Sequence, residues 1–357
     1  MSAPAAPSTT TDAPRRAPPL ALLAPLAAVL LSLAAGGVLI AAVGQSPIEV
    51  YGLLFQQALG TGYGVGQTLF KATPLVFAGL AVALAFRAGL FNVGAEGQMY
   101  LGGFTAALVG AHVALPAPFL MPLAVLAAGL AGALWGAVPG LLKARFGAHE
   151  VINSIMLNFI AYALVSWWGR SLFVPATVRT REIAEAAQIA RLDVWLPWLK
   201  GSPANFALLL GLVLALVLGV FLFRTRPGYE WRVLGWNPGA AEYAGVRTGV
   251  TQVQAFALSG ALAGLGGTSF VLGYKHWFEL DFTAGAGFMG IAVALIGRNH
   301  PLGVLVAALF FGMLAYGGLV VNQRVPSDLV NVLRALVILF AISTYALLDR
   351  ARRRRAA

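Results

Sequence analysis

The sequence predicts an all-α polytopic membrane protein with about ten transmembrane helices and an inverted 5+5 repeat. Of its 357 residues, 59% are apolar and 10% are charged, whereas a soluble globular domain carries about 25% charged residues. The mean hydropathy is +0.81. The apolar residues fall in runs of roughly 20, the length that crosses a bilayer as a helix. These observations exclude a soluble enzyme, a disordered chain and a nucleic-acid-binding domain.

The first apolar run follows a segment, 1–19, that is rich in Ala, Pro, Ser and Thr and is predicted to be disordered. This run, 20–43, is too long for the core of a signal peptide, and no clear cleavage site follows it. We therefore expect an uncleaved first helix. Nine further apolar runs are predicted to span the membrane: 67–86, 94–113, 120–142, 151–169, 204–223, 251–273, 284–297, 302–321 and 328–348.

The basic residues predict the orientation of these spans. Most of the 24 Lys and Arg residues fall on the side that carries both termini, and the short loops of the other side nearly lack them. The positive-inside rule then puts both termini in the cytoplasm. Residues 20–348 form one transmembrane domain with an external loop at 170–203 and a cytoplasmic loop at 224–250, and 349–357 form a basic cytoplasmic tail. The net charge of +11 is thus mainly a topology signal, and no nucleic-acid partner is expected.

Glycines recur every fourth residue in two of the predicted spans. Gly132, Gly136 and Gly140 form one such series, and Gly260 and Gly264 form another. Small residues at this spacing let helix backbones approach closely in lipid. The pattern favours packing within the fold, and an interface between subunits is the alternative.

Two segments of the chain resemble each other. Residues 91–99 read FNVGAEGQM and residues 282–289 read FTAGAGFM, so both follow F-x-x-G-A and then G-x-M with one residue missing in the second. Each opens a predicted span, and the two spans run in opposite directions. This fits two five-helix halves of inverted topology, an architecture that transporters use to build a central pathway. Chance similarity in a glycine-rich chain is the alternative.

Polar residues at two span starts are the candidates for a functional site. Asn92, Glu96 and Gln98 lie beside glycines, which permit a break between helices. They form either a cluster that caps a helix or a polar lining, or gate, of the substrate pathway. Asn153 and Asn158 lie on the fifth span, where they favour a hydrated cavity or hydrogen bonds between helices equally. We expect these five residues to line or gate the pathway.

Two basic residues also lie within predicted spans. Lys71 is near the outer end of the second span and Arg334 is in the last. Ionisable groups in spans are costly and usually face a pathway or a partner. For Lys71 we favour a side chain that reaches the outer headgroups.

The sequence offers no constellation for catalysis or for binding metal. Cysteine is absent, the four histidines lack helical metal-ligand spacing, and none of the four lysines fits a nucleotide-hydrolysing loop. We therefore expect no enzymatic activity and no cofactor bound by this chain; if transport is active, another subunit supplies the energy. In the cytoplasmic loop, Asn237-Pro238 is a helix-start signal and predicts a short exposed helix over 238–244.

Several motifs together resemble the permease subunits of bacterial ABC importers of the branched-chain amino acid, ribose and nucleoside superfamily. LFNVGAEGQMYLGG (90–103) is similar to the N-[IV]-G-x-E-G-Q signature of the nucleoside group, whose permeases are linked to basic membrane proteins. EVINSIMLNFIA (150–161), RVLGWNPGAAEYAGV (232–246), ALSGALAGLGG (257–267) and GFMGIAVALIGRNHPLG (287–303) match further stretches of that group. The resemblance runs from about residue 67 to 345.

The resemblance implies a ten-helix permease in the bacterial cell membrane, paired with a second permease subunit that is identical or different. Two cytosolic ABC ATPase subunits would use the ATP, and an extracytoplasmic binding protein would deliver the small-molecule substrate. The cytoplasmic loop would be the coupling helix that contacts the ATPase. Its residues are Asn237, Pro238, Ala240, Ala241, Glu242, Tyr243, Ala244 and Gly245.

The sequence and the resemblance together predict the membrane-spanning subunit of an ATP-driven importer of nucleosides. Neutral amides such as those of Asn92 and Asn158 can hydrogen-bond a base or a ribose without demanding a charge on the ligand. Within the same superfamily, a permease for a simple sugar or a purine derivative is the alternative. An ion-coupled secondary transporter is the alternative from a different class.

Overall fold

The computed structural model describes residues 20–322 and, beyond them, 324–326, 329, 331–333, 335, 336, 339, 340 and 343. Over these residues the chain is predominantly helical and β pairing is confined to three isolated bridges, which confirms the all-α class. The helices of ten or more residues are α1 (Leu20–Ala42), α2 (Pro47–Leu59), α3 (Gly62–Arg87), α4 (Ala95–His112), α5 (Ala117–Phe146), α6 (Glu150–Leu172), α7 (Ala207–Arg224), α8 (Arg226–Trp236), α10 (Thr248–Gly266), α12 (Ala286–Ile296) and α13 (Pro301–Val321).

Among the described residues, six helical segments are long and apolar enough to cross a membrane. They are α3, α5, α6, α7, α13 and the run Thr248–Lys275, in which α10 continues through α11 (Thr268–Phe270) and the π-helical turn η4 (Val271–Lys275). Each coincides with a predicted span. The bent pair α1 and α2, at 119°, makes a seventh if it is one span. The predicted span 94–113 is the helix α4, whose polar first turn lowers its hydropathy, and 284–297 contains α12.

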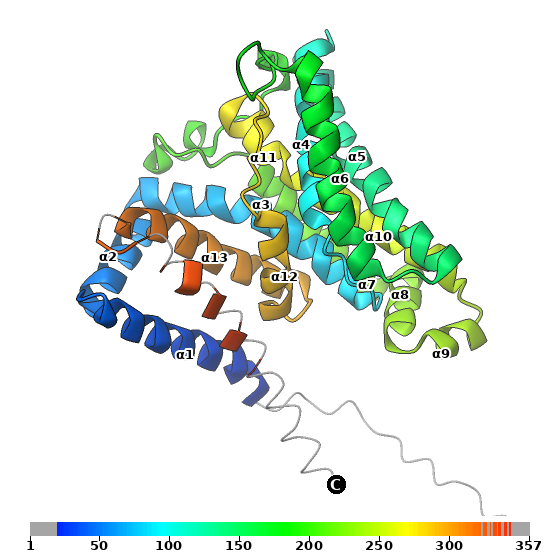
Figure 1. Ribbon diagram of the computed structural model, residues 1–357, viewed down its shortest axis with the longest axis horizontal. Helices are drawn as coiled ribbons and strands as arrows, with labels where there is room; N and C mark the ends of the chain where they lie inside the picture. Colours follow the sequence, from blue (N-terminus) through cyan, green and yellow to red (C-terminus); the bar gives the residue numbers. More distant parts are fainter. Residues whose placement is uncertain are drawn as a thin grey trace, which may run out of the picture.

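The predicted tenth span, 328–348, lies largely outside the described residues. The number of ten spans and the repeat of two five-helix halves therefore stay predictions. The element order of the described part is drawn in Figure 1, where α3 crosses the middle of the molecule.

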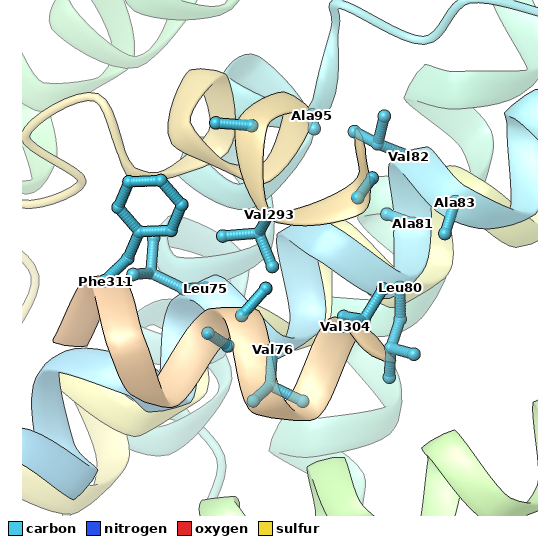
Figure 2. Packing of buried hydrophobic residues seen from close by; sticks show 14 of the residues in the cluster. Leu75, Val76, Leu80, Ala81, Val82, Ala83, Ala95, Val293, Val304 and Phe311 are labelled. Carbon is cyan, nitrogen blue, oxygen red and sulfur yellow. The ribbon is translucent and has the colours of Figure 1, made fainter. Parts of the chain in front are cut away.

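Helix α3 is the centre of the bundle. It packs against α13, α12 and α10, and 78% of its most apolar 18-residue stretch is buried inside the protein. Figure 2 shows Leu75, Val76 and Leu80 of α3 packed with Val293 of α12 and Phe311 of α13. Lipid tails are as apolar as these side chains, so close van der Waals packing rather than hydrophobic burial favours such contacts. This packing fixes α12 and α13 against α3.

The two glycine series pack against each other between α5 and α10. A Cβ atom on Gly132 would overlap the carbonyl oxygen of Gly260, and one on Gly136 would lie 2.5 Å from the carbonyl oxygen of Phe256. A Cβ on Gly264 would likewise overlap the backbone of α5. The two backbones are thus in direct contact, as the favoured interpretation of the sequence predicted.

The substitution Gly132→Val is expected to destabilise the protein by about 3 kcal/mol, since the added methyl groups meet backbone that cannot rotate away. The thermal unfolding midpoint of the purified protein in detergent measures this effect. Gly219→Val on α7 is the control, because nothing lies within 4 Å of a Cβ built at Gly219. Equal midpoints for the two variants would contradict the packing.

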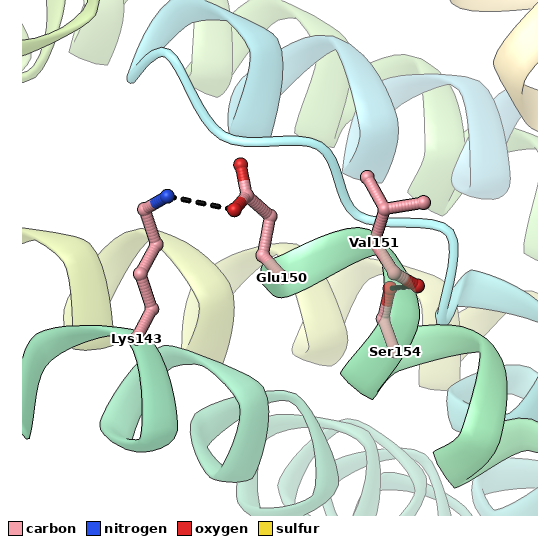
Figure 3. A network of polar contacts seen from close by, with 4 residues as sticks. All are labelled: Lys143, Glu150, Val151 and Ser154. Atoms are coloured by element: carbon pink, nitrogen blue, oxygen red, sulfur yellow. Dashed lines mark hydrogen bonds and ion pairs between the residues drawn. The ribbon is translucent and has the colours of Figure 1, made fainter. Parts of the chain in front are cut away.

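Helix α6 is held at its start by an ion pair to the end of α5. Gly147, at a φ of +65°, ends α5, and Lys143 Nζ then lies 2.7 Å from Glu150 Oε2 (Figure 3). One turn into α6 the hydroxyl of Ser154 donates to the carbonyl of Val151 at 3.2 Å. The pair is partly exposed and contributes about 0–1 kcal/mol. Its main effect is to fix the position of the first turns of α6.

The predicted external loop folds onto the segment that precedes α12. It contains the short 3-10 helices η1 (Glu185–Ala187), η2 (Leu192–Val194) and η3 (Pro197–Leu199). Backbone hydrogen bonds join Thr180 to Phe278 and Ile189 to Leu272, both at 2.9 Å. These bonds hold the irregular backbone between η4 and α12.

Candidate functional site

The connection between α3 and α4, residues 88–94, carries the first polar residue of the site. Asn92 is fully buried. Its Nδ2 donates to Gln98 Oε1 and to Ser259 Oγ, both at 2.8 Å, and its Oδ1 accepts from the amide of Gly94 at 2.9 Å. Ser259 in turn donates to the carbonyl of Ala81 at 2.7 Å. This network joins the connection to α3, α4 and α10.

The first turn of α4 is completed by a residue of α6. Asn158 Oδ1 accepts from the amide of Gly97 at 2.9 Å, and its Nδ2 donates to the carbonyl of Val93 at 3.0 Å. Gly97 and Asn158 are in close contact, since a Cβ built on Gly97 would lie 2.9 Å from the Cα of Asn158. A buried amide group is costly unless both ends are paired, and here they are.

Glu96 caps the start of α12 from α4. The carboxylate is 1% exposed. Its Oε1 accepts from the amide of Gly285 at 3.0 Å, and its Oε2 accepts from Gly287 at 2.6 Å and from Phe288 at 3.3 Å. These are amides at a helix N-terminus, which lack partners within the helix and favour a negative group. Glu96 therefore supplies the cap that α12 does not contain.

The two similar segments meet in space. Gly94 and Gly285 are the N-cap residues of α4 and α12, and Ala95 and Ala286 are the first helical residues. A Cβ on Gly287 would overlap the backbone of α4. With 11 residues, α12 is about 16 Å long, roughly half of a 30 Å hydrocarbon core. The starts of α4 and α12 therefore touch inside the protein. The side-chain amides of Asn92 and Asn158 accept from the backbone at the start of α4, and Glu96 accepts from the backbone at the start of α12.

The structure brings together four of the five predicted residues, namely Asn92, Glu96, Gln98 and Asn158. Asn153 lies apart from them, half-buried on α6, and its buried Nδ2 finds no partner among the described residues. The capping function is visible in the hydrogen bonds. Whether the same residues gate the pathway stays a prediction.

A cavity of about 310 Å³ lies beside the meeting point of the two helix starts. It is lined by residues of α3, α4, the α10–α11 region, α12, α13 and the irregular segment 282–285. Its polar side chains are Lys71, Ser269 and Thr283, and the aromatic rings on its walls are Phe70, Phe270, Phe282 and Phe311. Asn92, Glu96, Gln98 and Asn158 do not line this cavity.

The aromatic wall residues were missed by the reasoning from sequence. Phenylalanine occurs 21 times in the chain, so composition does not single out these positions. The one available signal was the similarity of 282–289 to 91–99, since Phe282 opens the second segment. Lys71 was expected near the outer headgroups, and it lies on the cavity wall.

The short helix predicted over 238–244 is present as α9 (Pro238–Tyr243). Asn237 caps it, since its Oδ1 accepts from the amide of Ala240 at 3.2 Å. Ala241 is buried, whereas Trp236 and Tyr243 are 92% and 98% exposed. Aromatic residues are enriched at the centre of protein–protein interfaces, so these two exposed side chains are typical of a surface that a partner covers. The hydroxyl of Thr248 donates to Glu242 at 3.1 Å and ties α9 to α10.

Helix α8, which precedes α9, rests on the α3–α4 connection. A Cβ on Gly89 would lie 2.8 Å from the Cα of Gly235, and one on Gly235 would overlap the carbonyl oxygen of Arg87. Arg87 also donates to the carbonyl of Asn299, just after α12, at 2.8 Å. The connection 88–94 is therefore flanked by the two residues, Arg87 and Glu96, that hold the two ends of α12.

Comparison with known proteins identifies this arrangement. The family described as branched-chain amino acid transport system / permease component matches residues 64–342. A guanosine ABC transporter permease protein of Bacillus subtilis is 39% identical over 91% of this chain and 94% of its own length. A glucose ABC transporter permease protein of Haloferax volcanii is 38% identical over 93% and 90%, and a nucleoside ABC transporter permease protein of Lactococcus lactis is 32% identical over 89% and 90%.

These matches cover nearly the whole described fold. They exclude the ion-coupled secondary transporter that the sequence alone left open. They also make the chain a multi-pass membrane protein and a non-catalytic transport component, with ATP handled by an ABC ATPase partner. The chain belongs to the branched-chain amino acid transport system / permease component family of ABC transporter permeases.

Proposed function

We propose that this ABC importer permease carries nucleosides into the cell. The observation that carries the proposal is the cavity of about 310 Å³ beside the breaks at which α4 and α12 start, which offers room for one small molecule and has no acidic residue among its described lining residues. Transporters place their substrate sites at such helix breaks. The substrate class follows from the guanosine and nucleoside permeases to which the chain is similar.

A simple sugar or a purine derivative is the second candidate. The glucose permease of Haloferax volcanii is about as similar to this chain as the guanosine permease of Bacillus subtilis. Identity over the whole chain, 39% against 38%, does not separate the two classes. The substrate must therefore be determined by transport measurements.

The proposed assembly has two permeases, two cytosolic ATPases that contact α9, and an extracytoplasmic binding protein. Both termini are in the cytoplasm, and ten spans form two inverted halves. The exposed aromatic residues Trp236 and Tyr243 support α9 as the contact with the ATPase. Closure of the ATPase dimer moves α9 and α8, and the polar residues Asn92, Glu96, Gln98, Asn153 and Asn158 gate the pathway.

Uptake of labelled guanosine tests this proposal. Cells that express the permease with its partner subunits are expected to take up guanosine, and an ATPase variant that cannot hydrolyse ATP is expected to abolish uptake. Excess unlabelled inosine should compete, and excess glucose or ribose should not. Uptake of labelled glucose in place of guanosine, with the same ATPase dependence, would assign the permease to sugars.

A further inference from the structure

The cavity has walls that are suited to one part of a nucleoside. Phe270 of α11 and Phe282 of the irregular segment before α12 are in ring contact, with centroids 5.2 Å apart and a tilt of 34°, and both also line the cavity. Phe70 of α3 forms a third wall. Rings are supported from behind: Tyr100 stacks on Phe282 at 5.9 Å, and Tyr274 contacts Phe70 at 4.8 Å. The walls are therefore held in place before any ligand binds, which limits the entropy lost on binding.

The backbone of the cavity supports a ligand site independently. Asp281 and Ala284 are non-glycine residues at positive φ, +60° and +46°, and Gly285 follows at +78°. Irregular backbone within a membrane domain is tolerated where it is buried in protein or lines a cavity. Thr283, Ala284 and Gly285 of this segment line the cavity. Glu96 pairs the backbone amides at this helix start and so holds the segment in the shape that lines the cavity.

The polar groups of the cavity restrict the ligand class. Ser269 is buried. Its carbonyl accepts from Asn205 Nδ2 at 3.0 Å, and its hydroxyl donates weakly to Asn205 Oδ1 at 3.5 Å, which fixes the residue in place. Thr283 is 6% exposed, and Lys71 Nζ lies 5.8 Å from the ring centre of Phe70. Hydroxyls can donate to or accept from the edge of a base. The lining contains no carboxylate and one ammonium, so a cationic ligand is disfavoured.

We propose that this cavity is a base-binding site within the permease, where the base of the transported nucleoside packs on the ring surfaces that Phe70, Phe270 and Phe282 present to the cavity and its edge contacts Ser269 and Thr283. The inference rests on nucleoside import as the proposed function. A hexose has no π system and carries hydroxyls around its whole rim, and the lining offers these hydroxyls few side-chain partners beyond Lys71, Ser269 and Thr283. Every nucleobase has a π face, so any base can stack on an aromatic ring, whichever substituents it carries.

A thiol-labelling experiment tests the site directly, because the chain contains no cysteine. Thr283→Cys places a single thiol in the cavity, and Ala114→Cys places one on the exposed loop between α4 and α5. In the assembled transporter in lipid vesicles, guanosine is expected to slow alkylation of Thr283→Cys by N-ethylmaleimide about 10-fold or more and to leave Ala114→Cys unchanged. Glucose is expected to protect neither.

Uptake kinetics give a second readout. Phe270→Ala and Phe282→Ala are expected to raise the KM for guanosine about 10-fold each through loss of stacking, whereas Phe282→Trp retains a ring and should stay near the unmodified value. Phe159→Ala is the matched control, since Phe159 is 61% exposed on α6.

The outcomes separate this inference from the proposed function. Guanosine uptake by the unmodified transporter, with no protection of Thr283→Cys and unchanged KM in both alanine variants, would overturn the base site and leave nucleoside import standing. Protection by glucose equal to that by guanosine would overturn the ligand class. Absence of guanosine uptake by the unmodified transporter would overturn nucleoside import and the base site with it.

Discussion

Replacing Glu96 with alanine is expected to reduce substrate uptake to less than about a tenth of the unmodified rate. The variant removes the acceptor for the amides of Gly285, Gly287 and Phe288 and leaves them buried without partners. Each unsatisfied group costs about 1–3 kcal/mol, and a tenfold change in a rate or equilibrium corresponds to about 1.4 kcal/mol. The start of α12 should then shift, and the adjoining cavity should lose its shape.

Two further variants show whether the hydrogen bonds are responsible. Glu96→Gln keeps one oxygen acceptor and should retain an intermediate uptake rate, because its NH₂ group cannot accept from Gly285 or Gly287. Glu185→Ala removes a carboxylate from an exposed 3-10 helix and should leave uptake unchanged. Membrane levels of all three proteins are measured by immunoblot. Unimpaired uptake by Glu96→Ala at normal membrane levels would rule out a transport role for the cap.

The sequence predicted features whose causes are local. Runs of apolar residues located α3, α5 and α13 within a few residues, since a helix in lipid must pair its own backbone along its whole length. Asn237-Pro238 predicted the start of α9, because an N-cap side chain acts within three residues. The spacing of Gly132 and Gly260 predicted a close helix contact, although it did not name the two partners.

Features that depend on tertiary contact could not be read from the sequence. Glu96 was recognised as polar and costly, and its partners lie 189 to 192 residues away in the chain. The pairing of Asn92 with Ser259 spans 167 residues. The cavity walls combine Phe70 and Phe270 from helices that no local pattern connects. Only packing of the whole bundle brings such groups together.

These contacts form a continuous path from α9 to the cavity. Helix α8 ends beside α9 and touches the α3–α4 connection through Gly235 and Gly89. The connection continues into Glu96, which holds the start of α12, while Arg87 at its other end holds the backbone after α12. We therefore expect movement of α8 to press on the segment that fixes both ends of α12. A perturbation at the contact between α8 and the connection tests this coupling.

The substitution Gly235→Val provides this perturbation and is expected to lower uptake about 10-fold or more while ATP hydrolysis continues. Its Cβ would overlap the carbonyl oxygen of Arg87 and lie 2.8 Å from the amide of Gly89, so α8 and the connection must separate. Overpacking of this kind costs about 1–3 kcal/mol. Gly235 faces the α3–α4 connection, whereas the neighbouring Trp236 is 92% exposed, so the proposed contact with the ATPase should persist.

The measurement is the ratio of substrate transported to ATP hydrolysed in vesicles that contain the assembled transporter and its binding protein. Gly249→Ala is the control, because the nearest atom to its added Cβ is the Cβ of Ala144 at 3.6 Å. A normal ratio in Gly235→Val would mean that the force of the ATPase reaches α12 by another route. A low ratio in Gly235→Val and a normal ratio in Gly249→Ala would locate the coupling at the contact between α8 and the α3–α4 connection. At this contact the backbone of Gly235 touches that of Gly89, beside the residues that hold α12.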